Sequence, residues 1–276
     1  MSLKTKDLSP RIGSEVETNA KTLLSGAHAE EIRELLEQRG VLVFHDINFT
    51  DEEMASFAET LGNIQGGSTY KGSIFKVTFD PEHNPHGETY LMGAQEWHID
   101  RTDIDVPPLG SMLTPRVLAT KGGQTDFANT YAAYEDLPEE EKRYLEGLKI
   151  EHRVEAPIRR QTPNPTEEQV KAWQAKEPKI HPLVWQHRSG RKSLVLGGTA
   201  CQVLGMDEKE SDALIERLMK WSEQPHYTYR HNWRMGDLVI WDNTGTMHRM
   251  VPFDKASGRR LHRVTLEGEE PILAVA

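Results

Sequence analysis

An apolar run, a turn and a histidine, DLVIWDNTGTMH, occupy residues 237–248. The first five residues form the most apolar strand candidate of the chain, and a turn around Gly245 separates them from His248. Other short strand candidates recur along the sequence, with a few amphipathic helices between them. We therefore expect a mostly β protein with peripheral helices, in which two sheets pack against each other in one domain.

Local patterns predict the other elements. Residues 50–53, TDEE, match a capping box and open a helix that runs to residue 61. Residues 111–118 and 124–128 flank the turn Lys121-Gly122-Gly123, which predicts a hairpin. Further helices are expected at 29–38, from 136 onward and at 207–221. Further strands are expected at 41–44, 74–79, 193–196, 227–233 and 263–266.

Two stretches, 63–96 and 153–182, combine proline and glycine or charge with little hydrophobic periodicity. Long loops of this kind are uncommon in compact domains unless they are functional. We expect them to be loop insertions that act as lids over a ligand and set its identity, with a simple surface excursion as the alternative for 63–96. The sequence shows no internal repeat and no clear linker, so we predict a single domain over 1–276 with a core from about 40 to 271.

Composition narrows the class of protein. The chain has 276 residues, 28% of them charged, and a formal net charge of −10, which argues against nucleic acid or a membrane as the general partner. Cys201 is the one cysteine, so neither an internal disulfide nor a cysteine-based zinc site can form. Residues 1–18 are polar, and no apolar run approaches the length of a membrane span. We expect a cytoplasmic protein.

A second short motif, WHID at residues 97–100, suggests a metal site. On a strand, residues two apart project from the same face, so His98 and Asp100 can reach one ion while Ile99 points the other way. His248 would supply a third ligand from a distant segment. Two histidines and a carboxylate on one face suit ferrous iron, because three coordination positions stay open. A lone His-x-Asp is weak evidence, and most of the twelve histidines must have other roles.

These motifs together resemble the TauD/TfdA family of iron(II)- and 2-oxoglutarate-dependent dioxygenases, named for taurine and 2,4-dichlorophenoxyacetate. The resemblance covers the chain from about residue 40 to 271. It rests on four stretches in the family's order: EWHID at 96–100, GGQTDFA at 122–128, GDLVIWDN at 236–243 with His248, and RRLHR at 259–263.

The resemblance implies a double-stranded β-helix (jelly-roll, cupin-like) core and a homo-oligomer, either a dimer or a tetramer. It implies that His98, Asp100 and His248 bind Fe(II), with no catalytic residue beyond these ligands. Arg259 and Thr125 match the residues that hold the far carboxylate of 2-oxoglutarate. A planar guanidinium and a directed hydroxyl suit that carboxylate. The expected reaction consumes 2-oxoglutarate and O2, releases succinate and CO2, and hydroxylates a small organic substrate.

The resemblance also points to an acidic substrate, such as a carboxylate, aryloxyalkanoate, sulfonate or sulfate ester. Arg263 matches the position that pairs with the substrate anion in several family members, although a structural ion pair is the alternative. Arg101 replaces a small apolar residue of the sulfonate-using relatives, and Ala94 replaces a polar amide. Arg101 would bind a second anionic group or pair with a nearby aspartate, and taurine itself is disfavoured. Arg260 is expected to be a solvated surface side chain.

Two other functions compete with the dioxygenase. A zinc hydrolase could use the same three ligands without redox chemistry, but it would leave Arg259 and Thr125 without a role. A catalytically silent protein that senses metal or 2-oxoglutarate is the other alternative. Because Asp100 is present, nothing supports an iron halogenase, which opens a chloride site by losing that carboxylate.

Overall fold

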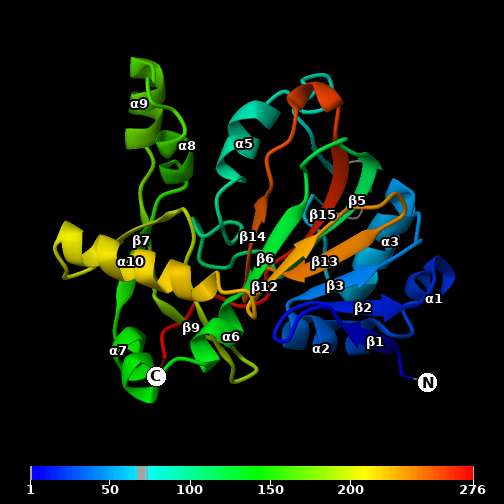
Figure 1. The fold of residues 1–276 in the computed structure, drawn as a ribbon, viewed down its shortest axis with the longest axis horizontal. Coiled ribbons are helices and arrows are strands. Elements are labelled where there is room, and N and C mark those ends of the chain that lie inside the picture. The colour runs from blue at the N-terminus through cyan, green and yellow to red at the C-terminus, as the bar shows by residue number, and fades with distance from the viewer. Residues whose placement is uncertain (1, 67–71, 73, 276) are drawn as a thin grey trace.

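The computed structural model describes residues 2–66, 72 and 74–275, and its largest sheet is built from strands far apart in the sequence (Figure 1). In this sheet β2 and β3 pair in parallel, and the other described neighbours pair antiparallel. The order across the sheet is β1 (Lys4–Asp7), β2 (Ser14–Glu17), β3 (Val41–Phe44), β13 (Leu238–Asp242), β5 (Gly110–Val117), β15 (Arg260–Leu266) and β4 (Phe75–Val77).

A smaller antiparallel sheet packs against one face of the large one. It has the order β12 (Thr228–His231), β6 (Thr125–Asn129) and β14 (Thr246–Met250). Phe127 of β6 contributes to one buried cluster with Val239 and Trp241 of β13, and the Phe127 and Trp241 ring centroids lie 5.8 Å apart. Two largely antiparallel sheets that share a core in this way are the layers of a jelly roll, so the predicted fold class is confirmed.

Helices cover the other face of the large sheet. Leu238 and Ile240 of β13 alternate with Val239 and Trp241 and join a second core cluster. That cluster includes residues from the helices on this face, which are α1 (Ala20–Leu24), α2 (Ala29–Arg39) and α3 (Asp51–Leu61). The central strand β13 is thus buried on both faces.

The capping box that the sequence predicts at the start of α3 is present. Thr50 accepts a hydrogen bond from the Glu53 backbone at 3.1 Å, and the Glu53 carboxylate accepts one from the Thr50 backbone at 2.9 Å. This exchange satisfies two backbone donors that a helix start otherwise leaves unpaired.

The middle of the chain forms a second layer of small elements beside the jelly roll (Figure 1). Its strands are β7 (Lys149–His152), β8 (Lys179–Pro182), β9 (Val184–Gln186), β10 (Lys192–Leu194) and β11 (Ala200–Val203). Its helices are α6 (Thr130–Glu135), α7 (Glu139–Glu146), α8 (Ala156–Arg160), α9 (Glu167–Gln174) and α10 (Glu208–Ser222). Elsewhere lie α5 (Gly87–Gly93) and the 3-10 turn η1 (Lys255–Ser257).

The two predicted loops contain regular structure. The stretch 153–182 holds α8, α9 and β8, and the described part of 63–96 holds β4 and α5. Thr166 and Gln169 form a second capping box at the start of α9. Proline and charge masked this local signal in the sequence.

The predicted hairpin of residues 111–118 and 124–128 is wrong. β5 pairs with β13 and β15 in the large sheet, whereas β6 pairs with β12 and β14 in the small one. The turn at Gly122 and Gly123 carries the chain from one sheet to the other, and both glycines have a φ of 75°. An apolar strand and a turn do not reveal which partner the strand will choose.

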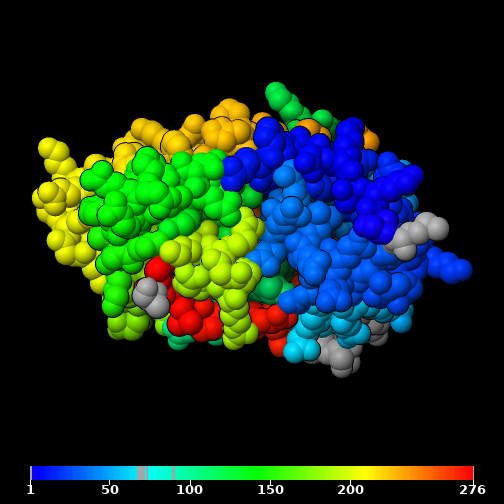
Figure 2. Space-filling model, turned by 90° about the horizontal axis from the view of Figure 1, so that it is seen from below, coloured from blue at the N-terminus to red at the C-terminus, as the bar shows by residue number. Residues whose placement is uncertain are grey.

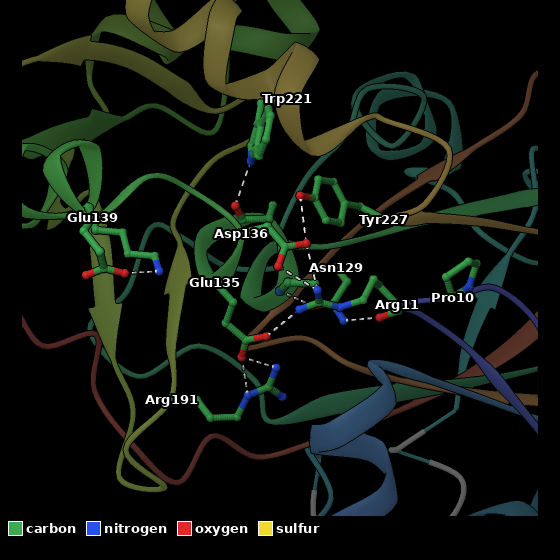
Figure 3. Close-up of polar contacts among 12 residues, drawn as sticks. Pro10, Arg11, Asn129, Glu135, Asp136, Glu139, Arg191, Trp221 and Tyr227 are labelled. Carbon is green, nitrogen blue, oxygen red and sulfur yellow. Dashed lines mark hydrogen bonds and ion pairs between the residues drawn. The ribbon is translucent and has the colours of Figure 1, made fainter.

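A polar network ties the N-terminal segment to the middle of the chain (Figure 3). Arg11 forms ion pairs with Glu135 at 2.8 Å and with Asp136 at 2.7 Å, and Arg191 reaches Glu135 at 2.7 Å. Trp221 of α10 donates a hydrogen bond from its indole to the Ala133 carbonyl at 2.7 Å.

No described helix is both long and apolar enough to cross a bilayer.

The space-filling view shows a hollow between α2 in blue, the turn before β10 in yellow-green and the C-terminal segment in red (Figure 2). It corresponds to a cavity of about 520 Å³ lined by residues such as Leu36, Arg188 and Asp242. None of the predicted site residues lines this cavity. The predicted metal-binding and 2-oxoglutarate-binding side chains lie instead between the two sheets.

Candidate metal and dicarboxylate site

Two segments from opposite ends of the chain bring His98, Asp100 and His248 together. The Nε2 atom of His98 lies 3.8 Å from one Asp100 carboxylate oxygen, and the Nε2 atom of His248 lies 3.6 Å from the other. Each of the three residues offers one ligand atom, and these atoms all lie within 4.8 Å of one another. The two imidazole centroids are 4.2 Å apart. Two imidazoles and one carboxylate converging from one side suit a divalent transition metal.

Backbone pairing holds this arrangement. His98 and His248 form an isolated antiparallel bridge, with His98 N donating to His248 O at 3.0 Å and His248 N donating to His98 O at 2.9 Å. Asp100 lies in the turn that follows, so the predicted strand through both residues shrinks to one bridge position. Ile99 is buried in the neighbouring core cluster, which sends the flanking side chains toward the metal site.

Side-chain contacts fix how the ligands present themselves. The Nδ1 atom of His98 lies 2.8 Å from the Glu96 carbonyl, which can only accept, so Nδ1 carries the proton and Nε2 offers its lone pair. The Asn243 amide accepts a hydrogen bond from Asp100 N at 2.8 Å and donates to the Asp100 carbonyl at 3.2 Å. Asn243 also donates to the Pro108 carbonyl at 3.0 Å and so ties three segments together.

The electrostatic environment keeps Asp100 ionised and His248 neutral. Burial raises the pKa of the Asp100 carboxyl, but the charge of Arg263, which also donates a hydrogen bond to this carboxylate, outweighs burial and holds that pKa well below its usual range. Burial lowers the pKa of His248 far below its ordinary value. A carboxylate and neutral imidazoles are the protonation states that metal ligands require.

Arg259 and Thr125 line a small cavity of about 40 Å³ together with His98 and His248. The Arg259 guanidinium is 2% exposed, donates to the Gly123 carbonyl at 2.7 Å and lies 4.8 Å from the Phe253 ring centroid. No carboxylate among the described residues pairs with it, and burial lowers its pKa to about 10. A buried cation of this kind is costly unless a ligand brings the opposite charge.

Arg263 reaches the same cavity, as its spacing from Arg259 predicts. It forms a close ion pair with Asp100, donates to Ser111 Oγ at 2.7 Å and to Thr265 Oγ1 at 3.1 Å, and lies 5.3 Å from the Trp241 ring centroid. The structural ion pair that is the alternative role for Arg263 is therefore present, and its partner is one of the three candidate metal ligands.

A larger cavity of about 460 Å³ adjoins the metal site on the side of His98 and Asp100. Apolar side chains make up much of its wall, and Arg101, Lys176 and Arg263 are the cations along it. Arg101 has a positive φ of 59° and pairs with Asp103 at 2.8 Å, one of the nearby aspartates anticipated for it. Arg260 lies outside both cavities and is half-buried, so it is less solvated than the sequence predicts for this surface side chain.

Sequence reasoning missed several residues that support the site. Asn243 follows the apolar strand without a signal of its own, yet it anchors the backbone of Asp100. Ser111 and Thr265 hold Arg263, and Trp233 donates from its indole to Thr125 Oγ1 at 3.1 Å. The tryptophans that flank the motifs are packing residues, since Trp97 and Trp241 are 5% and 1% exposed. Only the contact geometry reveals these supporting roles.

Comparisons with known proteins identify the family to which this chain is similar. The model of the taurine catabolism dioxygenase TauD, TfdA family matches residues 4–265. The alpha-ketoglutarate-dependent 2,4-dichlorophenoxyacetate dioxygenase of Burkholderia sp. (strain RASC) is 32% identical, covering 97% of this chain and 95% of that protein. The alkylsulfatase of Acinetobacter baylyi is also 32% identical, covering 97% of this chain and 86% of that protein.

A solved structure is similar over the whole length. The crystal structure of AAD-2 in complex with Mn(II) and N-oxalylglycine has a TM-score of 0.83 at 30% identity, covering 99% of this chain and 100% of that chain. N-oxalylglycine is a dicarboxylate with the same backbone length as 2-oxoglutarate.

Proposed function

The chain belongs to the TauD, TfdA family of dioxygenases, and from that premise we propose that it hydroxylates a small organic anion with Fe(II), 2-oxoglutarate and O2. His98, Asp100 and His248 would hold the iron, Thr125 and Arg259 would hold the far carboxylate of 2-oxoglutarate, and the primary substrate would enter the larger cavity.

One observation carries the proposal: a buried guanidinium without an anionic partner shares a small cavity with the three ligand residues. Arg259 needs a carboxylate that the described residues do not supply. Its fork of donors can bind a carboxylate through two parallel hydrogen bonds. A dicarboxylate that reaches from Arg259 to the metal ligands would neutralise this charge.

The donor set suits ferrous iron, since it leaves positions for a bidentate co-substrate and for O2. When bound, iron and 2-oxoglutarate would supply the oxidising chemistry, in which R–H, 2-oxoglutarate and O2 give R–OH, succinate and CO2. The protein itself positions the substrate carbon and excludes water, while Asn243 and the His98–His248 bridge hold the ligands in place.

Two alternatives fit less well. A zinc hydrolase would need only the three ligands and would gain nothing from a buried, charged Arg259. A silent sensor would use the whole dicarboxylate site without turning over a substrate. The relatives are named for dioxygenase chemistry, which favours an active enzyme.

The larger cavity suggests the class of primary substrate. Ile99, Pro108, Val154 and Ile158 present apolar surface to it. Arg263 provides buried positive charge between this cavity and the metal ligands, and we propose that it faces the anionic group of the substrate. A molecule with one acidic head and an apolar body fits this arrangement, as in aryloxyalkanoates, alkyl sulfates and other sulfate esters.

Arg101 offers a second cation at the more exposed part of the cavity. It is half-exposed and shares its charge with Asp103, so its electrostatic contribution is screened. We assign it to the entry of the anionic substrate rather than to the reacting end.

The experiment is a turnover screen on the Fe(II)-loaded protein that measures both O2 consumption and succinate. Aryloxyalkanoates, alkyl sulfates, alkyl sulfonates and plain carboxylates of equal chain length are compared, with the matching neutral alcohols as controls. The proposal predicts succinate formation that depends on one of the anions and is lost in Asp100→Ala. It fails if no acid stimulates succinate formation beyond the rate of the substrate-free enzyme.

Arg263→Gln tests the anion-binding role, with Mn(II) affinity measured alongside because Arg263 also pairs with Asp100. Its kcat/KM for the accepted acid should fall at least tenfold, since a hydrogen bond to a charged group contributes about 1.5 to 3 kcal/mol. Equal turnover of every accepted acid by this variant and the wild type would refute the assignment.

We further propose a homo-oligomer built from single-domain chains, for which light scattering should report two or four chains.

A further inference from the structure

A chain of contacts leads from the co-substrate threonine through the second sheet to the start of β13. Thr125, the first residue of β6, lies opposite His231 of β12 in the strand register. Trp233 follows two residues later and donates its indole N–H to Thr125 Oγ1 at 3.1 Å. Because an indole nitrogen can only donate, Thr125 Oγ1 is the acceptor in this bond.

This bond determines what the Thr125 hydroxyl can still do. A hydroxyl has one hydrogen to donate, and no acceptor for that hydrogen is found among the described residues around Thr125. Thr125 is 5% exposed and lines the small cavity beside Arg259. The indole therefore leaves Thr125 as a donor toward the cavity, which is the role that a carboxylate ligand needs.

Trp233 is itself held by a buried histidine. Its ring meets the edge of His231 at a centroid distance of 4.5 Å and an interplanar angle of 82°. The Nε2 atom of His231 lies 3.0 Å from the Asp237 carboxylate, and its Nδ1 lies 3.1 Å from the Tyr229 hydroxyl. Since that carboxylate can only accept, Nε2 carries the proton and Nδ1 accepts from Tyr229.

Asp237 is the anchor of the chain. It is 1% exposed and also accepts from His45 Nδ1 at 2.6 Å and from the Arg234 backbone at 2.8 Å. Burial raises its pKa, but its hydrogen bonds, above all with His231 and His45, outweigh burial and hold the pKa below the usual value. The bond from Arg234 closes the turn that carries Trp233, so one carboxylate fixes both the turn and the histidine.

We propose that Asp237, His231 and Trp233 form a positioning relay that orients the Thr125 hydroxyl as a hydrogen-bond donor to the far carboxylate of 2-oxoglutarate. This inference rests on the proposed function. None of the three residues touches the metal or the substrate cavity, so they act through Thr125. The relay sets affinity for the co-substrate and leaves the metal ligands unchanged.

The test is isothermal titration of 2-oxoglutarate into the Mn(II)-loaded protein, which reports binding without turnover. Trp233→Phe keeps the ring and removes only the N–H, and it should weaken binding by about fivefold, the effect of one neutral hydrogen bond. Mn(II) affinity should change less than twofold. Trp221→Phe is the matched control, because it removes an indole N–H that is bonded to the distant Ala133 carbonyl, and it should bind like the wild type.

A double-mutant cycle with Thr125→Val separates positioning from general packing. If Trp233 acts through the hydroxyl, Trp233→Phe should have no further effect on binding in the Thr125→Val protein. His231→Gln tests the same pathway at a second residue, since it keeps a donor for Asp237 but removes the ring that supports Trp233. Like Trp233→Phe, it should have no further effect on binding in the Thr125→Val protein.

Wild-type affinity in Trp233→Phe, or an undiminished loss in the Thr125→Val background, would overturn the relay. Failure of the wild type to bind 2-oxoglutarate at all would instead overturn the proposed function. The two failures are therefore distinguishable in the same set of titrations.

Discussion

Replacing Arg259 by methionine should make the ligand-free protein more stable while it loses co-substrate binding. Burial lowers the pKa of Arg259 from its ordinary value to about 10. At 1.36 kcal/mol per pKa unit, the charged guanidinium costs the folded state about 3 kcal/mol. The shift is downward, so this cost is present in full at neutral pH, below the folded pKa of about 10, and is relieved only as pH rises above that value toward the pKa of the unfolded chain.

Lost contacts offset part of that gain. Methionine cannot donate to the Gly123 carbonyl, a bond from a charged donor that contributes roughly 1.5 to 3 kcal/mol at most. The net effect is a gain of about 1 kcal/mol, or a rise in Tm on the order of 2–4 °C for a chain of this size. Binding of 2-oxoglutarate should weaken at least 100-fold, since a bidentate charged pair disappears.

Thermal unfolding with and without 2-oxoglutarate, in the presence of Mn(II), measures both effects. Arg259→Met should raise the Tm of the free protein and abolish the further rise that 2-oxoglutarate gives the wild type. Arg230→Met is the control, because Arg230 is half-exposed and pairs with Asp126 away from the cavity. A Tm that falls by several degrees in Arg259→Met, or a retained response to 2-oxoglutarate, would refute the reasoning.

Three further changes have defined outcomes. Asn243→Ala removes the amide that holds the Asp100 backbone and should weaken Mn(II) binding by about 10- to 100-fold in a calorimetric titration. Unchanged affinity would show that Asn243 does not hold the metal ligands in place. Asp100→Ala leaves Arg263 buried without its carboxylate and should lower the free energy of unfolding of the metal-free protein by about 3–5 kcal/mol in urea, and a neutral result would mean that Arg263 finds another anion. Thr50→Ala breaks the capping box of α3 and should lower the free energy of unfolding by about 1 kcal/mol in the same urea experiment. Metal binding should not change, and a loss of metal affinity would contradict a purely local role for Thr50.

The sequence contained enough information to predict the fold class and the residues that converge on the metal site. A continuous apolar run identified β13, and the capping box identified the start of α3. Ordered motifs placed His98, Asp100 and His248 in one site although two of them lie far from the third in the chain. These signals are local, or depend on residue type and order, so they can be read from the sequence alone.

Partner choice and supporting contacts could not be predicted in this way. The hairpin error at Gly122 and Gly123 arose because either sheet could satisfy the backbone of β6, and only the packing of Phe127 into the core decides between them. Arg263 illustrates the same limit: its position predicted an anion, but only the structure places its guanidinium against a metal ligand. Trp233 gave no signal, because a single indole donor has no characteristic spacing.

The central claim is that Arg259, Thr125 and the three ligands form one site for Fe(II) and 2-oxoglutarate. Anaerobic addition of 2-oxoglutarate to the Fe(II)-loaded protein tests it most directly, with visible absorption as the readout. We expect a weak charge-transfer band that saturates with 2-oxoglutarate, is absent in His98→Ala, and requires at least 100-fold more 2-oxoglutarate in Arg259→Met. No band in the wild type, or an undiminished band in His98→Ala, would contradict it.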